Sequence, residues 1–180
     1  MKPVGRRAAG GLLKRSFGPI TDSRTRLLVL GSLPGEESLA RSRYYAHPRN
    51  QFWLLMGDVI GVGLDRLDYD ARLAALLAAH VGLWDVVESA ARRGSLDANI
   101  RGHRANRLVA LTASLPCLSA VAFNGATAAA IGRRQLADID GLTLVALPSS
   151  SPAHTLPLAE KRTRWRTLRS FLHDSDRARS

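Results

Sequence analysis

The sequence predicts an α/β fold: a single three-layer domain with a central, mostly parallel four-stranded sheet flanked by helices. The chain has 180 residues, which suits one domain with a sizeable core. From Arg26 onward, short apolar runs alternate with segments of helical pattern, and no repeat or interdomain linker interrupts them. Strands that alternate with helices favour a parallel sheet covered by helices on both faces.

Four segments are expected to form the sheet. Residues 27–30 are a continuous apolar run that ends at Gly31, and residues 120–123 and 142–147 are similar runs. Residues 83–87 are expected to be a shorter strand. The helices are expected at residues 51–59, 70–79, 106–115, 125–131 and 158–172. Ala and Leu content favours the second of these helices, and the last one places its apolar side chains on one face.

The charge distribution favours a polyanionic partner. The net charge is +11. Residues 1–26 carry seven Lys or Arg against one acid, and residues 157–180 carry seven against three. A basic tail and a solvated helix face would produce the same pattern, but the excess favours nucleic acid. Residues 1–25 have few periodic apolar residues and are predicted to be a flexible basic arm ahead of a domain at residues 26–180.

Composition excludes several other classes of protein. The single cysteine, Cys117, excludes an internal disulfide, an iron–sulfur cluster and a Cys-rich zinc site. The five histidines are widely spread without ligand spacing, so we expect no metal and no cofactor. No apolar run approaches the roughly 18 residues of a membrane span, and the apolar core of a secretory signal is missing. A cytoplasmic protein is expected.

Three unusual loops follow three of the predicted strands. Residues 31–35, Gly-Ser-Leu-Pro-Gly, form a tight turn that lets backbone N–H groups approach a ligand, although such turns end many strands. Asn124 and Gly125 form the second loop. Residues 148–154 place three serines between prolines, and hydroxyl and backbone donors of this kind commonly hold phosphates. The carboxyl ends of parallel strands share one edge, so all three loops should line one crevice.

Residues 44–53 combine four aromatic residues with His47, Arg49 and Asn50. Aromatic faces stack on nucleobases, and an amide can hold a water or a base edge. Phe52 and Trp53 are expected to be core residues at the start of a helix. Asn50 could be the N-cap of that helix. For Tyr45 and Asn50 we favour a functional role, because the proline at position 48 keeps the preceding chain extended.

Together these motifs resemble the uracil-DNA glycosylase superfamily. The resemblance covers about residues 26–172 and is closest to the hypoxanthine-DNA glycosylase branch, with the mismatch-specific uracil glycosylases next. It rests on Gly-x-x-Pro-Gly after the first strand, Tyr-Ala-His-Pro-Arg-Asn-Gln-Phe-Trp at residues 45–53 and Pro-Ser-Ser-Ser-Pro-Ala-His at residues 148–154. The motifs Gly-Leu-Trp-Asp-Val at residues 82–86 and Gly-Ser-Leu-Asp at residues 94–97 agree with it.

The resemblance implies a role for each candidate residue. The mismatch-specific relatives place a water with an asparagine where this chain has Leu33. The hypoxanthine branch also lacks that asparagine and has its catalytic asparagine in the His-Pro segment, at the position of Asn50. The implied catalytic residues are Asn50 and His154. The implied base-binding residues are Ser32, Leu33, Tyr45, Asp85 and Asn124. The implied DNA-binding residues are Ser149, Ser150, Ser151, Pro152 and Ala153.

The expected function is that of a monofunctional DNA glycosylase in base-excision repair. It would hydrolyse the N-glycosidic bond of a flipped deaminated base, hypoxanthine or uracil, in a DNA partner. These motifs contain no lysine, which argues against Schiff-base chemistry. The alternatives are a mismatch-specific uracil or thymine glycosylase, a non-catalytic lesion- or nucleic-acid-binding protein, which Leu33 keeps open, and an enzyme of free nucleosides. We expect a cytoplasmic, nucleoid-associated monomer without membrane contact.

Overall fold

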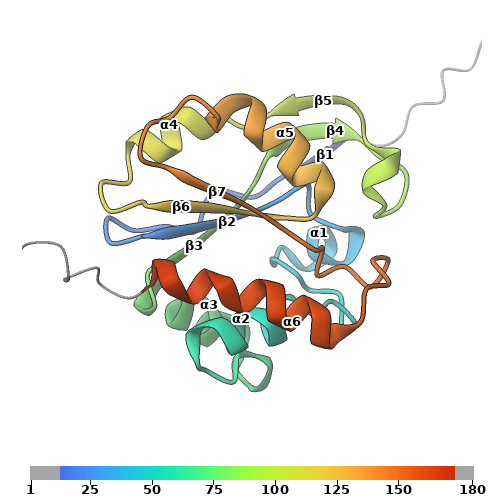
Figure 1. Ribbon diagram of the computed structural model, residues 1–180. Coiled ribbons are helices and arrows are strands. Elements are labelled where there is room, and N and C mark those ends of the chain that lie inside the picture. The colour runs from blue at the N-terminus through green and yellow to red at the C-terminus, as the bar shows by residue number, and fades with distance from the viewer. Residues whose placement is uncertain (1–12, 173–180) are drawn as a thin grey trace, which may run out of the picture.

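The computed structural model describes residues 13–172, and a four-stranded sheet in the order β3-β2-β6-β7 lies at their centre (Figure 1). The strands are β2 (Leu27–Gly31), β3 (Val81–Asp85), β6 (Ala120–Asn124) and β7 (Thr143–Leu147). Every neighbouring pair is parallel. The predicted four-stranded sheet is thereby confirmed, and it is parallel throughout.

Helices cover both faces of this sheet and confirm the three layers (Figure 1). One face carries α2 (Phe52–Ile60), α3 (Tyr69–Ala78) and α6 (Leu158–Arg166), which continues as η3 (Thr167–Phe171). The other face carries α4 (Leu108–Ala113) and α5 (Ala126–Leu136). Three short elements lie in the connections: α1 (Glu36–Arg41), η1 (Leu64–Arg66) and η2 (Asp97–Asn99).

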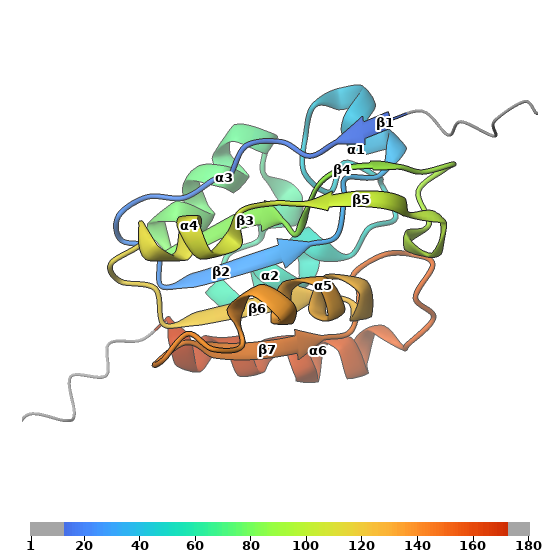
Figure 2. The same cartoon turned by 90° about the horizontal axis from the view of Figure 1, so that it is seen from above.

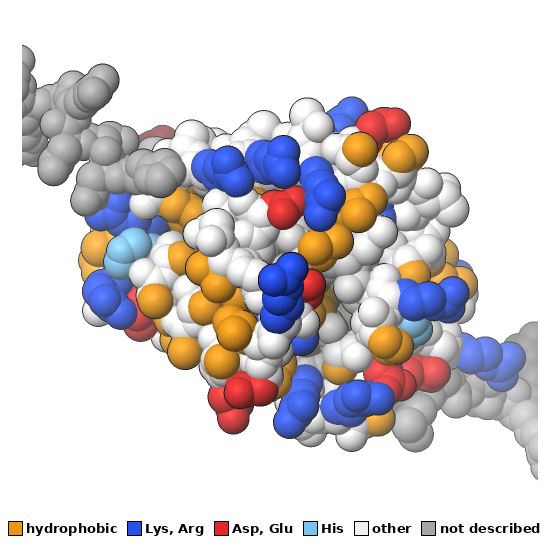
Figure 3. Space-filling model, turned by 90° about the horizontal axis from the view of Figure 1, so that it is seen from below, with side chains coloured by type: hydrophobic (Ala, Val, Ile, Leu, Met, Phe, Trp, Pro, Cys, Tyr) orange, Lys and Arg blue, Asp and Glu red, His pale blue; other side chains and the backbone are white. Residues whose placement is uncertain are grey.

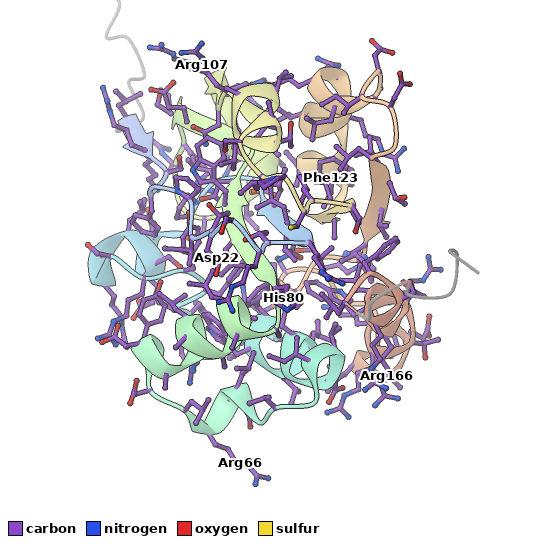
Figure 4. All side chains as sticks on the ribbon, turned by 90° about the vertical axis from the view of Figure 1, so that its left-hand side faces the viewer. Asp22, Arg66, His80, Arg107, Phe123 and Arg166 are labelled. Atoms are coloured by element: carbon purple, nitrogen blue, oxygen red, sulfur yellow. The ribbon has the colours of Figure 1, made fainter. Side chains whose placement is uncertain are left out.

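The alternation of side chains along β2 divides the core into two clusters. Leu27 and Val29 pack in the cluster under α2, α3 and α6, whereas Leu28 and Leu30 pack in the cluster under α4 and α5. All four are fully buried. Phe123 of β6 lies beside α5 (Figure 4), where a Cβ on Gly132 would come within 2.2 Å of its ring. The glycine therefore lets α5 lie close to the sheet.

A second sheet, which the sequence did not predict, lies beyond the second cluster (Figure 2). It is antiparallel, in the order β1-β4-β5, with β1 (Leu13–Arg15), β4 (Val87–Ala91) and β5 (Arg101–Ala105). The predicted strand at residues 83–87 spans the end of β3 and the start of β4. The sequence of β5 shows no apolar alternation because four of its five residues are exposed.

The predicted flexible arm at residues 1–25 is wrong for residues 13–25. β1 pairs with β4, and Ile20 forms an isolated bridge with Leu83. The indole of Trp84 donates to the carbonyl of Phe17 at 2.9 Å. These bonds anchor the segment to the domain. β1 also covers an edge of β4 that would otherwise be unpaired. Residues 1–12 of the predicted arm lie outside the described residues.

Basic side chains are spread over much of the described surface. Figure 3 shows Lys and Arg at several places on the face formed by α2, α3 and α6, with apolar side chains between them. Arg66, Arg107 and Arg166 project outward from separate parts of the molecule (Figure 4). Within residues 13–172, no helix has the length and apolar character that crossing a membrane requires.

Candidate active site at the strand ends

A cleft of about 560 Å³ lies at the carboxyl ends of the parallel strands. The loops after β2, β6 and β7 all contribute to its lining, which confirms that they converge. Its lining includes every residue to which the sequence assigned a role: Ser32, Leu33, Tyr45, Asn50, Asp85, Asn124, Ser149, Ser150, Ser151, Pro152, Ala153 and His154. A neighbouring groove of about 810 Å³ shares Tyr45 and Asn50 with it.

Two buried polar groups without partners lie at the cleft. Asp85, at the end of β3, is 3% exposed, and neither its Oδ2 nor the hydroxyl of Tyr45 makes a hydrogen bond within residues 13–172. A Cβ on Gly31 would lie 2.7 Å from Asp85 Oδ1 and 3.1 Å from the Tyr45 hydroxyl, so the glycine leaves room for both groups. Buried polar groups without partners are rare in folded proteins. These two therefore mark a place where a polar ligand can bind.

Burial sets the protonation state of Asp85. Desolvation raises the pKa of its carboxyl to about 8, with Asp97 raising it further and Arg92 opposing the change. The group is therefore mostly neutral at pH 7, when it can both donate and accept a hydrogen bond. Burial, followed by the charge of Asp85, also raises the pKa of Tyr45, whose hydroxyl stays protonated.

The ring of Tyr45 is already stacked on one side. Its centroid lies 3.7 Å from that of Phe52 with an interplanar angle of 9°. Phe52 and Trp53 are buried, as the sequence predicted. The backbone of Tyr45 has a φ of 51°, in the left-handed region. Only the face of the ring opposite Phe52 could stack on a nucleobase.

Two hydrogen bonds join Asn124 and Ser150 on the lining of the cleft. The backbone N–H of Ser150 donates to Asn124 Oδ1 at 2.8 Å, and Asn124 Nδ2 donates to Ser150 Oγ at 2.8 Å. Since a backbone N–H can only donate, this pair fixes the orientation of the amide and leaves one Nδ2 hydrogen for a ligand. Ser150 is fully buried, and both its hydroxyl and its backbone N–H are engaged with Asn124.

The other two serines shape the loop after β7. Ser149 Oγ accepts from the N–H of Ser151, and Ser151 Oγ accepts from the N–H of Ala153. Pro152, Ala153 and His154 are exposed at the rim. Turns of this type keep the backbone rigid and present its tip to solvent.

Lys161 of α6 supports this loop from behind, at a position that no sequence motif indicated. The residue is 1% exposed. Its Nζ donates to Gln51 Oε1 and to the carbonyl of His154, both at 2.9 Å, and to the carbonyl of Ser151 at 3.5 Å. Lys161 thus joins the loop after β7 to the segment that begins α2.

Asn50 precedes α2 at the same junction. Its Oδ1 accepts from the N–H of Phe52, two residues ahead, at 3.0 Å, which is an Asx-turn bond. The N-cap of α2 is Gln51, so the interpretation of Asn50 as the N-cap is wrong. Its Nδ2 makes no hydrogen bond within the described residues. The backbone N–H of Gln51 donates to the carbonyl of Ser150 at 3.0 Å. The Asx-turn bond therefore holds the side chain of Asn50 at the start of α2 and leaves its amide nitrogen available.

The loop after β2 is held by a second buried cation that the sequence did not indicate. Arg92 is 1% exposed. Its guanidinium donates to the carbonyls of Leu33, Pro34 and Gly94 and lies 3.8 Å from the carboxylate of Asp97. Each peptide plane places its N–H opposite its carbonyl. The carbonyls bound by Arg92 therefore fix the course of residues 33–35 along the cleft.

Two predicted base-binding residues on this loop are already engaged. Ser32 Oγ donates to Asp97 Oδ1 at 2.7 Å. The side chain of Leu33 is 5% exposed and belongs to the core cluster under α5. Within residues 13–172 no group of three or more His, Cys, Asp or Glu side chains could hold a metal ion.

A cleft of this kind, at the carboxyl ends of a parallel sheet and with unpartnered polar groups, defines an α/β enzyme with a polar ligand. Comparison with known proteins identifies the family. The model of the uracil DNA glycosylase superfamily matches residues 17–170. The chain therefore belongs to the uracil DNA glycosylase superfamily and is a DNA glycosylase, a hydrolase that acts on N-glycosyl bonds.

Individual relatives agree with this family. A hypoxanthine DNA glycosylase of Methanosarcina barkeri is 42% identical over 112 residues, covering 62% of this chain and 71% of the relative. A hypoxanthine DNA glycosylase of Methanosarcina acetivorans is 34% identical over 157 residues, covering 87% and 98%. An NMR structure from Methanosarcina acetivorans, provisionally assigned as a uracil DNA glycosylase, has a TM-score of 0.80 at 34% identity and covers 90% of this chain and 100% of that one.

Proposed function

We propose that this protein removes hypoxanthine from DNA by hydrolysing the N-glycosidic bond of a nucleotide flipped into the cleft. The observation that carries the proposal is the set of neutral polar groups that line it. Burial raises the pKa of Asp85 to about 8, which favours its neutral form, Asn124 offers one fixed N–H, and Tyr45 offers a hydroxyl. The relatives named hypoxanthine DNA glycosylases support the choice of base.

The chemistry of these groups fits a deaminated base. Hypoxanthine presents an oxygen acceptor beside an N–H donor, whereas adenine presents an amino donor where hypoxanthine has its oxygen. The spare N–H of Asn124 can bond an oxygen and cannot bond an amino group. The neutral carboxyl of Asp85 can donate to one atom and accept from its neighbour. Uracil has a similar oxygen and N–H edge and is therefore the second candidate.

Asn50 is proposed to place the water that attacks C1′. It lies on the lining of the cleft, and Leu33 has no polar side chain that could do so. The departing base carries developing negative charge, which donors on Asp85 and Asn124 would stabilise. Lys161 is committed to three oxygens behind the loop, in keeping with hydrolysis rather than Schiff-base chemistry.

The rim is proposed to hold the DNA strand around the flipped nucleotide. Ser149, Ser151 and the exposed residues 152–154 would contact the backbone. A single copy of the chain contains the whole cleft, so we propose a monomer that acts on nucleoid DNA in the cytoplasm.

The test is a panel of labelled oligonucleotides. Each contains hypoxanthine, uracil, xanthine or mismatched thymine, in single strands and opposite each base, and alkali after incubation reveals abasic sites. We expect cleavage at hypoxanthine to be fastest. Abasic sites at none of these bases would overturn the proposal, and a uniform preference for uracil or thymine would replace the substrate.

Replacement of Asn50 tests the assignment of the water. Asn50→Ala should slow single-turnover cleavage by about 10²-fold, the usual cost of losing one well-placed polar group at a transition state. Asp68→Ala is the matched control, because Asp68 caps α3 through the N–H of Ala71 at 2.9 Å and does not line the cleft. Each variant loses one side-chain bond to the backbone at the start of a helix, which should cost about 1 kcal/mol of stability. Equal cleavage by both variants would move the assignment to Asp85 or His154.

A further inference from the structure

Lys161 is a buried lysine without an acidic partner among the described residues. Both lysines within residues 13–172 are buried, and the other one, Lys14, lies 2.9 Å from the carboxylate of Glu36. The bonds of the Lys161 ammonium all go to neutral oxygens. The cost of removing an ammonium from water offsets most of what such bonds contribute to stability. Stability is therefore a weak reason for a lysine at this position, and the groups that it joins suggest another.

The Lys161 ammonium lies between two segments to which the proposed function gives different tasks. It donates to Gln51 Oε1 at 2.9 Å, and Gln51 follows Asn50, the residue proposed to place the water. It also donates to the carbonyls of His154 at 2.9 Å and Ser151 at 3.5 Å, which lie on either side of the exposed tip of the loop after β7. This loop is proposed to contact the DNA backbone. One nitrogen thus links the segment that would place the water to the loop that would hold the DNA.

Helix α6 fixes the position of this ammonium. Trp165, one turn after Lys161, is fully buried in the core cluster under α2, α3 and α6. Its indole donates to the carbonyl of Pro148 at 3.0 Å. The indole therefore holds the start of the loop at residues 148–154, and the ammonium holds its end at His154. Figure 1 shows this loop leading from β7 into α6. Side chains of one packed helix thus hold the loop at both ends.

A backbone hydrogen bond joins the same two segments. The N–H of Gln51 donates to the carbonyl of Ser150 at 3.0 Å. Two segments joined by one hydrogen bond can still turn about it, whereas a second link at another point removes this freedom. The Gln51 side chain and Lys161 provide this second link. Together the two links set the orientation of the segment that carries Asn50 relative to the loop.

We propose that Lys161 is a positioning residue, which keeps the loop after β7 and the segment carrying Asn50 in the relative orientation that cleavage requires. The inference rests on the proposed function. Cleavage needs the sugar, held by the loop through the DNA backbone, and the water, held by Asn50, at a fixed distance from one another. A misplacement of about 1 Å can slow such a reaction by about 10²-fold. Because Lys161 is 1% exposed, it acts through these segments and not on the substrate itself.

The first test compares Lys161→Met with Asp68→Ala in single-turnover cleavage of a hypoxanthine oligonucleotide. Methionine can fill the space of the lysine but cannot donate, so we expect cleavage at saturating enzyme to slow by about tenfold or more and the affinity for DNA to fall by about threefold or more. Asp68→Ala controls for lost stability, because it removes a capping bond of α3 and does not line the cleft. It should leave both quantities unchanged.

Gln51→Ala separates the two tasks. It removes the link to the segment of Asn50 and leaves the bonds of Lys161 to the loop, so we expect cleavage to slow by about fivefold with unchanged affinity. Affinity is titrated with an oligonucleotide whose hypoxanthine nucleotide carries a 2′-fluorine, which resists hydrolysis. The double variant Gln51→Ala with Lys161→Met should cleave no more slowly than Lys161→Met alone, because both changes remove the same bond.

Several outcomes would overturn the positioning role. These are wild-type cleavage by folded Lys161→Met, an equal loss in Asp68→Ala, or losses that multiply in the double variant. If Lys161→Met does not fold, wild-type cleavage by Gln51→Ala overturns the role as well. Absence of cleavage by the wild-type protein would instead overturn the proposed function. Melting of each variant shows whether it is folded.

Discussion

Each of the two walls of the cleft is a loop whose carbonyls are bound by a buried cationic side chain, and the cation differs between them. Arg92 holds the wall formed by the loop after β2, and Lys161 holds the wall formed by the loop after β7. Each is 1% exposed. Arg92 has a carboxylate at 3.8 Å, whereas the three bonds of Lys161 all go to neutral oxygens.

This difference suggests that the walls differ in stability. A guanidinium stays charged in proteins and bonds several carbonyls at once in a fixed plane. An ammonium is a compact, strongly hydrated charge, so burial without an anion is more costly for it. Burial lowers the pKa of Lys161 accordingly. The wall held by Arg92 is therefore expected to be the more firmly fixed of the two.

The largest expected effect is that of removing Arg92. Arg92→Met should lower the free energy of unfolding by about 3–5 kcal/mol, because it leaves the carbonyls of Leu33, Pro34 and Gly94 without their charged donor. Urea unfolding measures the loss. Arg92→Lys should recover little of it, since one ammonium cannot reproduce the planar set of bonds. Full recovery by lysine would remove the distinction between the walls.

The pH dependence of stability tests whether the Asp85 carboxyl is protonated in the folded protein. Besides burial, two charged residues shift its pKa, and both of them, Asp97 and Arg92, contact the wall formed by the loop after β2. Because the folded pKa is raised, the folded state holds a proton that the unfolded chain releases. Stability from this group is therefore present below about pH 4 and is lost as the pH rises to about 8.

The slope can reach about 1.4 kcal/mol per pH unit. Urea unfolding of the wild type and of Asp85→Asn across this range measures it, and the variant should show the flatter profile. A wild-type profile as flat as that of Asp85→Asn would show that the carboxyl is ionised in the folded protein.

The smallest expected effect is that of removing Lys161. Lys161→Met loses three hydrogen bonds but also removes a buried charge without a carboxylate partner, and these changes oppose one another. We expect a net loss of about 1 kcal/mol in urea unfolding. The loop after β7 should become more susceptible to proteolysis. A loss as large as that of Arg92→Met would show that both walls depend equally on their cations.

The strands that the sequence predicted are those with a simple physical pattern. Residues 27–30, 120–123 and 142–147 are continuous apolar runs, and the structure has β2, β6 and β7 there. β1 and β5 were missed because most of their residues are exposed, and only the start of β4 was predicted because its buried residues, Val87 and Ala90, are three positions apart. None of the three strands therefore shows a continuous apolar run or an alternation. Their pairing depends on contacts between distant segments.

The site was predictable in position but not in its supporting contacts. Loops at the carboxyl ends of parallel strands must converge, which placed Asn124 correctly on the lining of the cleft. Asp85, which also lines it, was indicated by the resemblance to the family and not by this argument. The sequence could not reveal that Ser150 is buried against Asn124. Arg92 and Lys161 were also missed, since charged residues are rarely buried and nothing local marks the exceptions.

The strand order β3-β2-β6-β7 has a consequence for how the protein folds. The central pair, β2 and β6, joins residue 27 to residue 120. The contact with the cleft loops that lies furthest along the chain is that of Lys161. Such distant pairings lose loop-closure entropy before their contacts contribute any favourable free energy, and this slows folding. The cleft therefore forms only when nearly the whole described chain has assembled, and hydrogen exchange at its loops should report late, cooperative steps rather than a local intermediate.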